Sequence, residues 1–220
     1  MKHSFIQDLE ERKRHVRHYL AVVMIAERTA KLGTATVAEN GRLLMLRAGT
    51  FLILYNLIEA SVRGAVEAIH DKISSQSVPF DRLSPRLRSE IVRKFKSQSD
   101  TSALHTRADF SSAFVAVALG QEIKMSGTID ARSIRALGDR YGFSCETQKT
   151  RTRDGSDLLI IKNKRNDLAH GLKTFDEVGR DFTSKDLVQL SRRTICFMTD
   201  ILMNIASYLE NQSYLEKPET

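Results

Sequence analysis

The sequence has no tryptophan, three prolines, eleven glycines and two cysteines among its 220 residues. With so few prolines and glycines, little interrupts helices, and the many Leu, Ala, Glu, Lys and Arg residues favour them. Cys145 and Cys196 provide neither a disulfide framework nor a paired metal site, which argues against a small disulfide-stabilised fold. A reducing compartment is the simplest interpretation of this cysteine usage.

Long hydrophobic runs are also absent. The most apolar stretch, residues 51–58, is too short to span a bilayer and contains Asn56, with Glu59 directly after it. The N-terminus, MKHSFIQDLEERKR, is too charged for a signal peptide. We therefore expect a cytoplasmic protein without a membrane partner.

The composition is that of a globular protein, with 41% hydrophobic and 28% charged residues. The length suits one domain, which we expect over residues 1–210, followed by a flexible tail at 211–220. The net charge of +7 suits a polyanionic partner such as RNA, although a solvated basic surface would explain it equally well.

The sequence pattern predicts an all-α bundle with long core helices. Caps, stops and apolar spacing place helices at about 4–32, 41–74, 85–96, 107–119, 130–141, 156–170 and 184–209. The helix at 41–74 is apolar nearly all round, which is typical of a bundle centre or a dimer interface. Ser156 is the expected cap of its helix, and the polar segment 144–157 is expected to form a small hairpin or a mobile loop.

Three basic segments are candidates for contact with nucleic acid. The cluster at 12–18 is more typical of a solvated helix face than of a binding site, and QKTRTR at 148–153 of a solvated loop. The helix at 130–141 carries Arg132, Arg135 and Arg140, but no convincing helix–turn precedes it, so a DNA-recognition helix is disfavoured.

The sharpest feature is IKNKRNDLAHG at residues 161–171, which contains Arg165 and His170. A bare Arg-x-x-x-x-His match arises easily by chance, so the context decides its weight. The motif ends a helix anchored by an apolar run, and Gly171 stops that helix just after the histidine. On an ideal helix, Arg165 lies about 140° round from His170. The two therefore converge only through the length of the arginine or through a second copy of the chain.

These residues resemble the signature of the HEPN family (higher eukaryotes and prokaryotes nucleotide-binding domains), in which Arg, a polar residue, three further residues and His end a bundle helix. Arg165, Asn166 and His170 match that signature. The blocks at 55–62, 126–143 and 164–187 resemble recurrent blocks of one stand-alone prokaryotic branch. The resemblance implies a helical bundle that dimerises, sets two Arg/His motifs around one cleft, and in catalytic members cuts RNA without metal.

The chemistry is plausible from first principles. Histidine can take a proton from the ribose 2′-OH or give one to the leaving 5′-oxygen, and a planar guanidinium can hold the charged phosphorane. We expect catalytic roles for Arg165 and His170, and RNA contacts from Lys162 and Lys164. Asn166 and Asp167 would support the site. We expect no metal and no cofactor.

Glu59 and Arg63 are the remaining candidates, as i,i+4 partners in the apolar helix at 41–74. Glu59 either orients Arg165 or His170, or simply pairs with Arg63, and the sequence leaves both interpretations open. The functional alternatives also remain open. One is an endoribonuclease acting as a toxin or defence effector, with an antitoxin or defence-system partner. The other is a non-catalytic module that binds nucleotide, RNA or a protein.

Overall fold

The computed structural model describes residues 3–31, 36–96, 110–120 and 128–217, and confirms the all-α class for them. The α-helices are α1 (Ser4–Lys31), α2 (Val37–Ser75), α3 (Pro85–Lys96), α4 (Phe110–Leu119), α5 (Ala131–Tyr141), α6 (Lys149–Thr152), α7 (Ser156–Ala169), α8 (Phe175–Arg180) and α9 (Ser184–Glu210). Short 3-10 turns cover Phe80–Arg82 and Arg153–Gly155. In this part of the chain, β-pairing is limited to a single bridge between Leu83 and Leu215. The sequence is polar and loop-like at 97–106, and that expected loop lies outside the described part.

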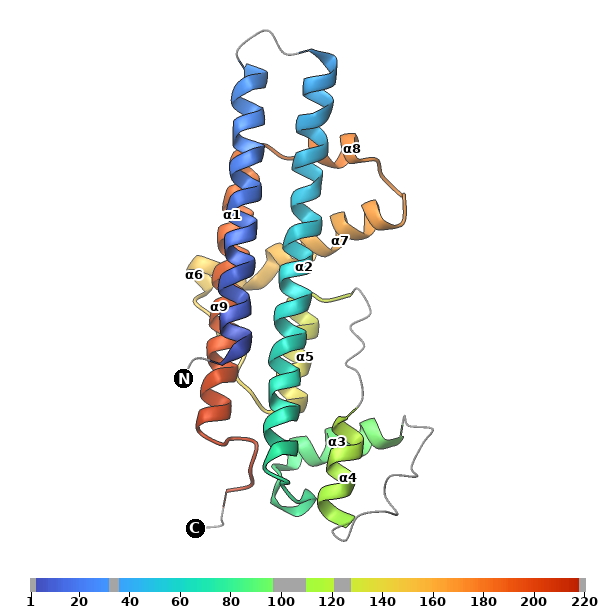
Figure 1. Cartoon of the computed structure of the whole chain (residues 1–220), viewed down its shortest axis with the longest axis vertical. Helices are drawn as coiled ribbons and strands as arrows, with labels where there is room; N and C mark the ends of the chain where they lie inside the picture. The colour runs from blue at the N-terminus through green and yellow to red at the C-terminus, as the bar shows by residue number, and fades with distance from the viewer. Residues whose placement is uncertain (1–2, 32–35, 97–109, 121–127, 218–220) are drawn as a thin grey trace.

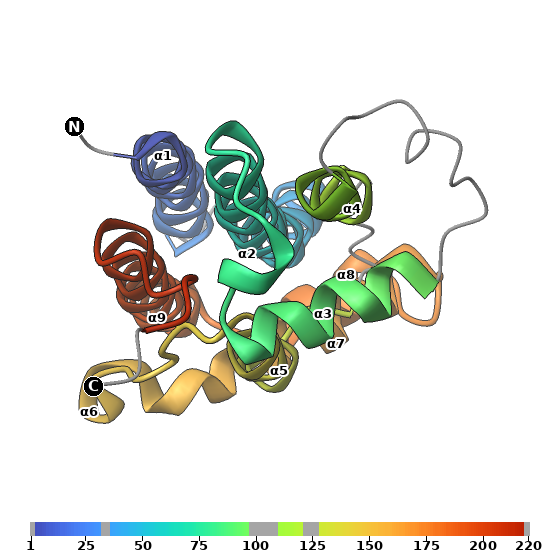
Figure 2. The same cartoon turned by 90° about the horizontal axis from the view of Figure 1, so that it is seen from below.

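Helices α1, α2 and α9 form the long frame of the molecule (Figure 1), and an end-on view shows them side by side as three columns (Figure 2). Helix α2 packs against α1, α7, α8 and α9, and fifteen of its residues are buried. The prediction that its sequence belongs to a bundle centre is confirmed.

Side-chain caps explain where the frame helices begin. Thr36 caps α2 by accepting from the backbone N–H of Glu39 at 3.2 Å, and the Glu39 carboxylate accepts from the Thr36 backbone in return. Thr183 and Asp186 form the same reciprocal box at the start of α9. Helix α2 therefore starts four residues before the position predicted, because its cap lies before the apolar run.

Helix α7, which carries the motif, crosses behind α2 (Figure 1) and is anchored at its first half. Leu158 and Ile161 are fully buried. Gly155, just before the helix, has a φ of +76°, and a Cβ there would lie 2.6 Å from the Phe197 ring and 2.7 Å from Ala131. Only glycine fits this close approach to α9 and α5, which fixes the angle at which α7 enters the bundle.

Three local expectations differ from the structure. Residues 144–157 form no hairpin: α6 and a 3-10 turn occupy residues 149–155 and pack on α9. Ser156 is not the cap of α7, since Gly155 holds that position without a side-chain hydrogen bond. Helix α8 was not predicted, although Thr174 caps it in a box with Glu177.

Part of the tail expected to be flexible is anchored, although most of its described residues are exposed. Tyr214 is fully buried, its carbonyl accepts from the Ser84 backbone N–H at 2.9 Å, and its hydroxyl donates to Gln76 at 2.6 Å. Residues 211–217 thus close the end of α2 and the start of α3, and residues 218–220 lie outside the described part.

One described helix, α2, is long and apolar enough to cross a membrane by length and composition. Such a helix is weak evidence for a membrane span, because a core helix passes the same test. Its packing against α1, α4, α7, α8 and α9 accounts for its apolar residues.

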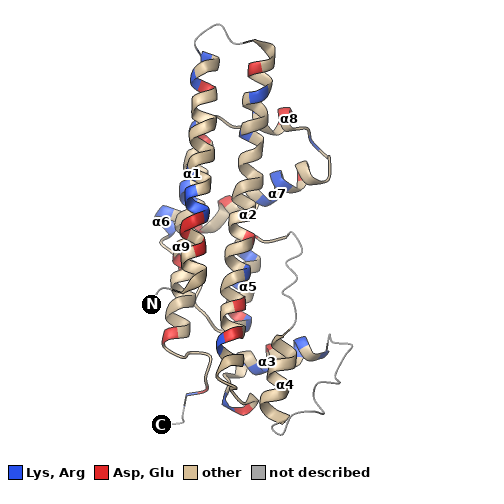
Figure 3. Cartoon of the chain, in the orientation of Figure 1, with Lys and Arg blue, Asp and Glu red and all other residues tan. Residues whose placement is uncertain are grey.

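Charged residues of both signs are mixed along the frame helices (Figure 3). Within the basic cluster of α1, the exposed residues are Arg14, His15, Arg17 and His18, as a solvated face requires. Lys13, however, is buried and pairs with Glu10 at 2.7 Å, and Arg12 is half-buried towards α2. The cluster is therefore not a uniform solvated face.

Candidate active site

His170 lies at the C-terminal cap of α7, where a complete Schellman motif ends the helix. Gly171 adopts a φ of +67°, its N–H donates to the carbonyl of Leu168 at 3.3 Å, and the N–H of Leu172 donates to that of Asp167 at 2.8 Å. The predicted glycine stop is confirmed. Because the helix stops at Gly171, His170 is the C-cap residue of α7 and does not lie within a helical turn.

The His170 side chain is exposed. Over the described ranges, no hydrogen bond or ion pair involves its imidazole. The imidazole is therefore accessible to a ligand or to another chain.

Arg165 lies about one and a half turns before His170 on α7. Its side chain is half-buried and stacks on the ring of Tyr55. Its guanidinium carbon lies 4.7 Å from the centroid of Tyr55 on α2, and its Nη1 donates to Asn166 at 3.0 Å. Such cation–π contacts contribute about 0.5–2 kcal/mol. In the described part of the chain, no carboxylate lies within ion-pair distance of Arg165. Its charge is thus oriented without being neutralised.

Tyr55 is held in place by the burial of its ring and by a hydrogen bond at its hydroxyl. Its side chain is buried, and its hydroxyl accepts from the backbone N–H of Ile129 at 3.2 Å. Burial raises the pKa of the Tyr55 hydroxyl, and the nearby Glu59 carboxylate raises it further, so the phenol stays neutral. Tyr55 was not singled out from the sequence, although it lies one helical turn before Glu59, on the same face of α2.

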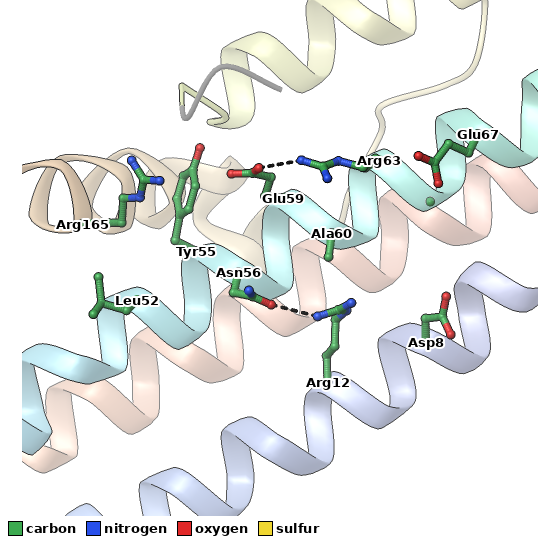
Figure 4. A pocket seen from close by; sticks show the side chains of 11 residues that line it. Asp8, Arg12, Leu52, Tyr55, Asn56, Glu59, Ala60, Arg63, Glu67 and Arg165 are labelled. Carbon is green, nitrogen blue, oxygen red and sulfur yellow. Dashed lines mark hydrogen bonds and ion pairs between the residues drawn. The ribbon is translucent and has the colours of Figure 1, made fainter. Parts of the chain in front are cut away.

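Glu59 and Arg63 form an ion pair of 2.8 Å, with side chains 21% and 40% exposed. The simple pairing that the sequence left open is therefore present. Tyr55 lies between Glu59 and Arg165 (Figure 4). Glu59 could therefore orient Arg165 only indirectly, through Tyr55. That role remains a prediction.

These side chains line one open cavity of 520 Å³ beside α2, with α1 on one side and α7 on the other (Figure 4). The polar residues that line it include Arg12, Tyr55, Asn56, Glu59, Arg63 and Arg165. His170 is not among the lining residues. Within one chain, the arginine faces the cavity while the histidine, about 7.5 Å further along the axis, projects from the helix end. Within one chain the length of the arginine does not bring the two together, which leaves the second of the two alternatives that the 140° offset allowed, a second copy of the chain.

The two lysines expected to bind RNA already have acidic partners. Lys162 pairs with Asp130, the N-cap of α5. Lys164 pairs with Asp181 at 2.7 Å and lies 5.5 Å from the Phe182 ring. Asp167 contributes its backbone carbonyl to the end of α7. In the described ranges, no three His, Cys, Asp or Glu side chains are grouped as metal ligands.

A comparison with protein-family models matches residues 1–214 to the HEPN_MAE_28990-like HEPN family. Comparisons with curated proteins and with solved structures gave no match. The family match spans nearly the whole chain, including the Arg165–His170 motif, and HEPN domains are all-α, as the described helices are. The chain therefore belongs to the HEPN superfamily, within the HEPN_MAE_28990-like HEPN family.

Proposed function

We propose that the protein is a metal-independent endoribonuclease that cuts RNA through Arg165 and His170. Members of this superfamily are often ribonuclease-like. The observation that carries the proposal is the state of the two side chains: Arg165 is fixed on Tyr55 without a carboxylate partner in the described ranges, and His170 is exposed with its ring unengaged there. An arginine neutralised by a carboxylate, or a buried histidine, would indicate a structural role instead.

In the proposed reaction, the ribose 2′-oxygen attacks the adjacent phosphorus as a base removes its proton. The bond from phosphorus to the 5′-oxygen breaks, and that oxygen takes up a proton. The products are a 2′,3′-cyclic phosphate and a 5′-hydroxyl. A histidine suits both proton transfers, and the planar guanidinium of Arg165 suits the phosphorane oxygens.

We propose that the working site is composite and lies in a homodimer. One chain places Arg165 and His170 apart, whereas a two-fold pairing of α7 ends would bring the histidine of one copy to the arginine of the other. Apolar side chains stand beside the histidine at Leu172, which is 72% exposed, and at Phe175, which is 37% exposed. Such exposed apolar residues suit a contact between copies.

The deciding experiment incubates wild-type protein and His170→Ala with total RNA in the presence of EDTA. Cleavage by the wild type, reduced about 10²–10⁴-fold in the variant, is expected for loss of a general acid–base group. Equal cleavage by both proteins would refute the proposal. Circular dichroism of both proteins checks that the fold is intact.

The second candidate is a non-catalytic HEPN module that binds nucleotide, RNA or a partner protein. The separation of His170 from the Arg165 cavity within one chain favours it, because binding needs only the cavity. A monomer in solution that binds RNA without cutting it would support this candidate. The cytoplasmic location, the toxin or defence role and an antitoxin partner belong to the first candidate as family analogies.

A further inference from the structure

Arg12 on α1 reaches the same cavity from the other side of α2. Its Nη1 donates to the side-chain oxygen of Asn56 at 2.8 Å, which uses one of five guanidinium N–H groups. Asp8, one turn earlier on α1, also lines the cavity, yet no carboxylate of the described residues is within ion-pair distance of Arg12. Arg12 is thus held in place by a neutral amide while its charge remains uncompensated.

Arg12 and Arg165 share this arrangement. Each donates to an asparagine oxygen, Arg12 to Asn56 and Arg165 to Asn166, and each lines the cavity. Arg63 differs, because Glu59 neutralises it. A guanidinium that is oriented by a neutral partner and open to a cavity is suited to an anion with several oxygens, such as a phosphate.

The two arginines are too far apart to hold one phosphate. Their neighbours on α2, Tyr55 and Asn56, are consecutive residues that point to different sides of the helix, so Arg165 and Arg12 flank it (Figure 4). A helix with its side chains is about 10 Å across. A separation of that order matches different phosphates of one strand better than the oxygens of a single group.

The far end of the cavity has the opposite sign. Asp8 on α1 and Glu67 on α2 lie at the end of the cavity away from Arg165 (Figure 4), and both line it; Asp8 is also one turn from Arg12. A phosphate backbone bound at Arg165 would be repelled from these carboxylates, so it would not extend past Arg12 towards them. The strand would therefore pass across α2 between the two arginines rather than run along the cavity.

We propose that Arg12, held by Asn56, is a second phosphate subsite that binds the RNA strand a few nucleotides from the phosphate at Arg165. This subsite rests on the proposed function, since it takes Arg165 as the contact to the scissile phosphate. It makes the substrate an oligonucleotide strand rather than a mononucleotide.

The test measures binding, so it does not depend on cleavage. A fluorescein-labelled single-stranded RNA is titrated with the full chain carrying His170→Ala, with and without Arg12→Gln, at several salt concentrations. Loss of one charge-assisted contact should weaken binding about tenfold. The slope of log K against log salt should fall by about 0.7, the value for one phosphate on a single strand.

Two further variants separate the subsite from general charge. Arg14→Gln removes the same charge from an exposed position on α1 outside the cavity, and should leave both affinity and slope unchanged. Asn56→Asp places a carboxylate on the atom that Arg12 now contacts at 2.8 Å, and should weaken RNA binding as Arg12→Gln does, because the new ion pair competes with phosphate.

Equal losses in Arg12→Gln and Arg14→Gln, or no RNA binding by any variant, would overturn the subsite. An equal loss of affinity for adenosine 5′-monophosphate would assign Arg12 to a free nucleotide and would also overturn it. If wild type fails to cut RNA yet Arg12→Gln alone lowers affinity and slope, the ribonuclease proposal fails and the subsite stands.

Discussion

The guanidinium of Arg165 rests on the ring of Tyr55, 4.7 Å from its centroid, and the Tyr55 hydroxyl is itself bound to the backbone of Ile129. The arginine of the motif is therefore aligned by the core helix α2 and not by its own helix alone. A ring offers orientation without neutralising the charge, whereas a carboxylate in the same place would compete with phosphate.

Tyr55 is predicted to act as a positioning residue for Arg165. Tyr55→Phe keeps the ring and should retain most of the activity, whereas Tyr55→Leu should lower kcat about tenfold, the worth of a partly buried cation–π contact. Steady-state cleavage of a labelled RNA separates kcat from KM. A purely structural role would be contradicted by rescue in Tyr55→Phe together with unchanged thermal stability of Tyr55→Leu. If Tyr55→Leu cuts at the wild-type rate, the positioning role is wrong.

Arg165→Lys should bind RNA but lose most of the rate. A lysine keeps the positive charge, yet a point charge cannot make the two parallel hydrogen bonds of a guanidinium to phosphate oxygens. We expect kcat to fall about 10²-fold or more with a much smaller change in affinity. Arg63→Lys is the matched control, because that arginine is already paired with Glu59. Similar rates for Arg165→Lys and wild type would remove the phosphorane role from this residue.

The use of the substrate's own 2′-OH as nucleophile makes a chemical prediction. An oligonucleotide with a single 2′-deoxy or 2′-O-methyl sugar at the scissile position should not be cut there, while neighbouring sites remain sensitive. Product ends are read by mass spectrometry, with a 2′,3′-cyclic phosphate and a 5′-hydroxyl expected. Cleavage at the blocked position would show that water or another group attacks.

Residue patterns in the sequence predicted the frame helices and the end of α7, because caps and glycine stops act locally. They also gave the offset of about 140° between Arg165 and His170, since the 3.6-residue period fixes it, but left open whether the length of the arginine or a second copy of the chain closes it. The contact between Tyr55 and Arg165 joins residues 110 positions apart and has no local signal. Arg12 was assigned to a solvated face for the same reason: its partner Asn56 is brought to it only by the packing of α1 on α2.

Two glycines offer a matched test of the end of α7. Gly171 and Gly41 both have open space where a Cβ would be added, but Gly171 has a φ of +67° and Gly41 lies within α2. Gly171→Ala should destabilise the fold by about 1 kcal/mol through backbone strain, and Gly41→Ala should stabilise it by up to about 1 kcal/mol. Urea unfolding measures both. A neutral Gly171→Ala would mean that the Schellman turn at His170 does not persist in solution.

His70 provides a prediction about acid stability. It is 5% exposed, accepts or donates a 2.8 Å hydrogen bond with the Tyr141 hydroxyl, and lies 3.4 Å from Lys94. Burial, with the charge of Lys94 as the second cause, lowers the pKa of His70 to about 3. Because the unfolded chain titrates near pH 6.5, the unfolded state binds the extra proton first as the pH falls. Stability should therefore be lost between about pH 6.5 and pH 3, with up to about 1.4 kcal/mol per pH unit due to this group.

The substitution His70→Gln isolates that contribution, since glutamine can bond to the Tyr141 hydroxyl and does not titrate. The variant should be less stable than wild type at pH 7, where it loses the stacked ring, but its free energy of unfolding should decline less steeply towards pH 4. Urea unfolding at pH 7, 6, 5 and 4 gives both curves. Parallel curves would show that the acid sensitivity comes from groups other than His70. A shallower curve for the variant would identify His70, which joins α2 to Tyr141 on α5, as a group whose protonation destabilises the fold in acid.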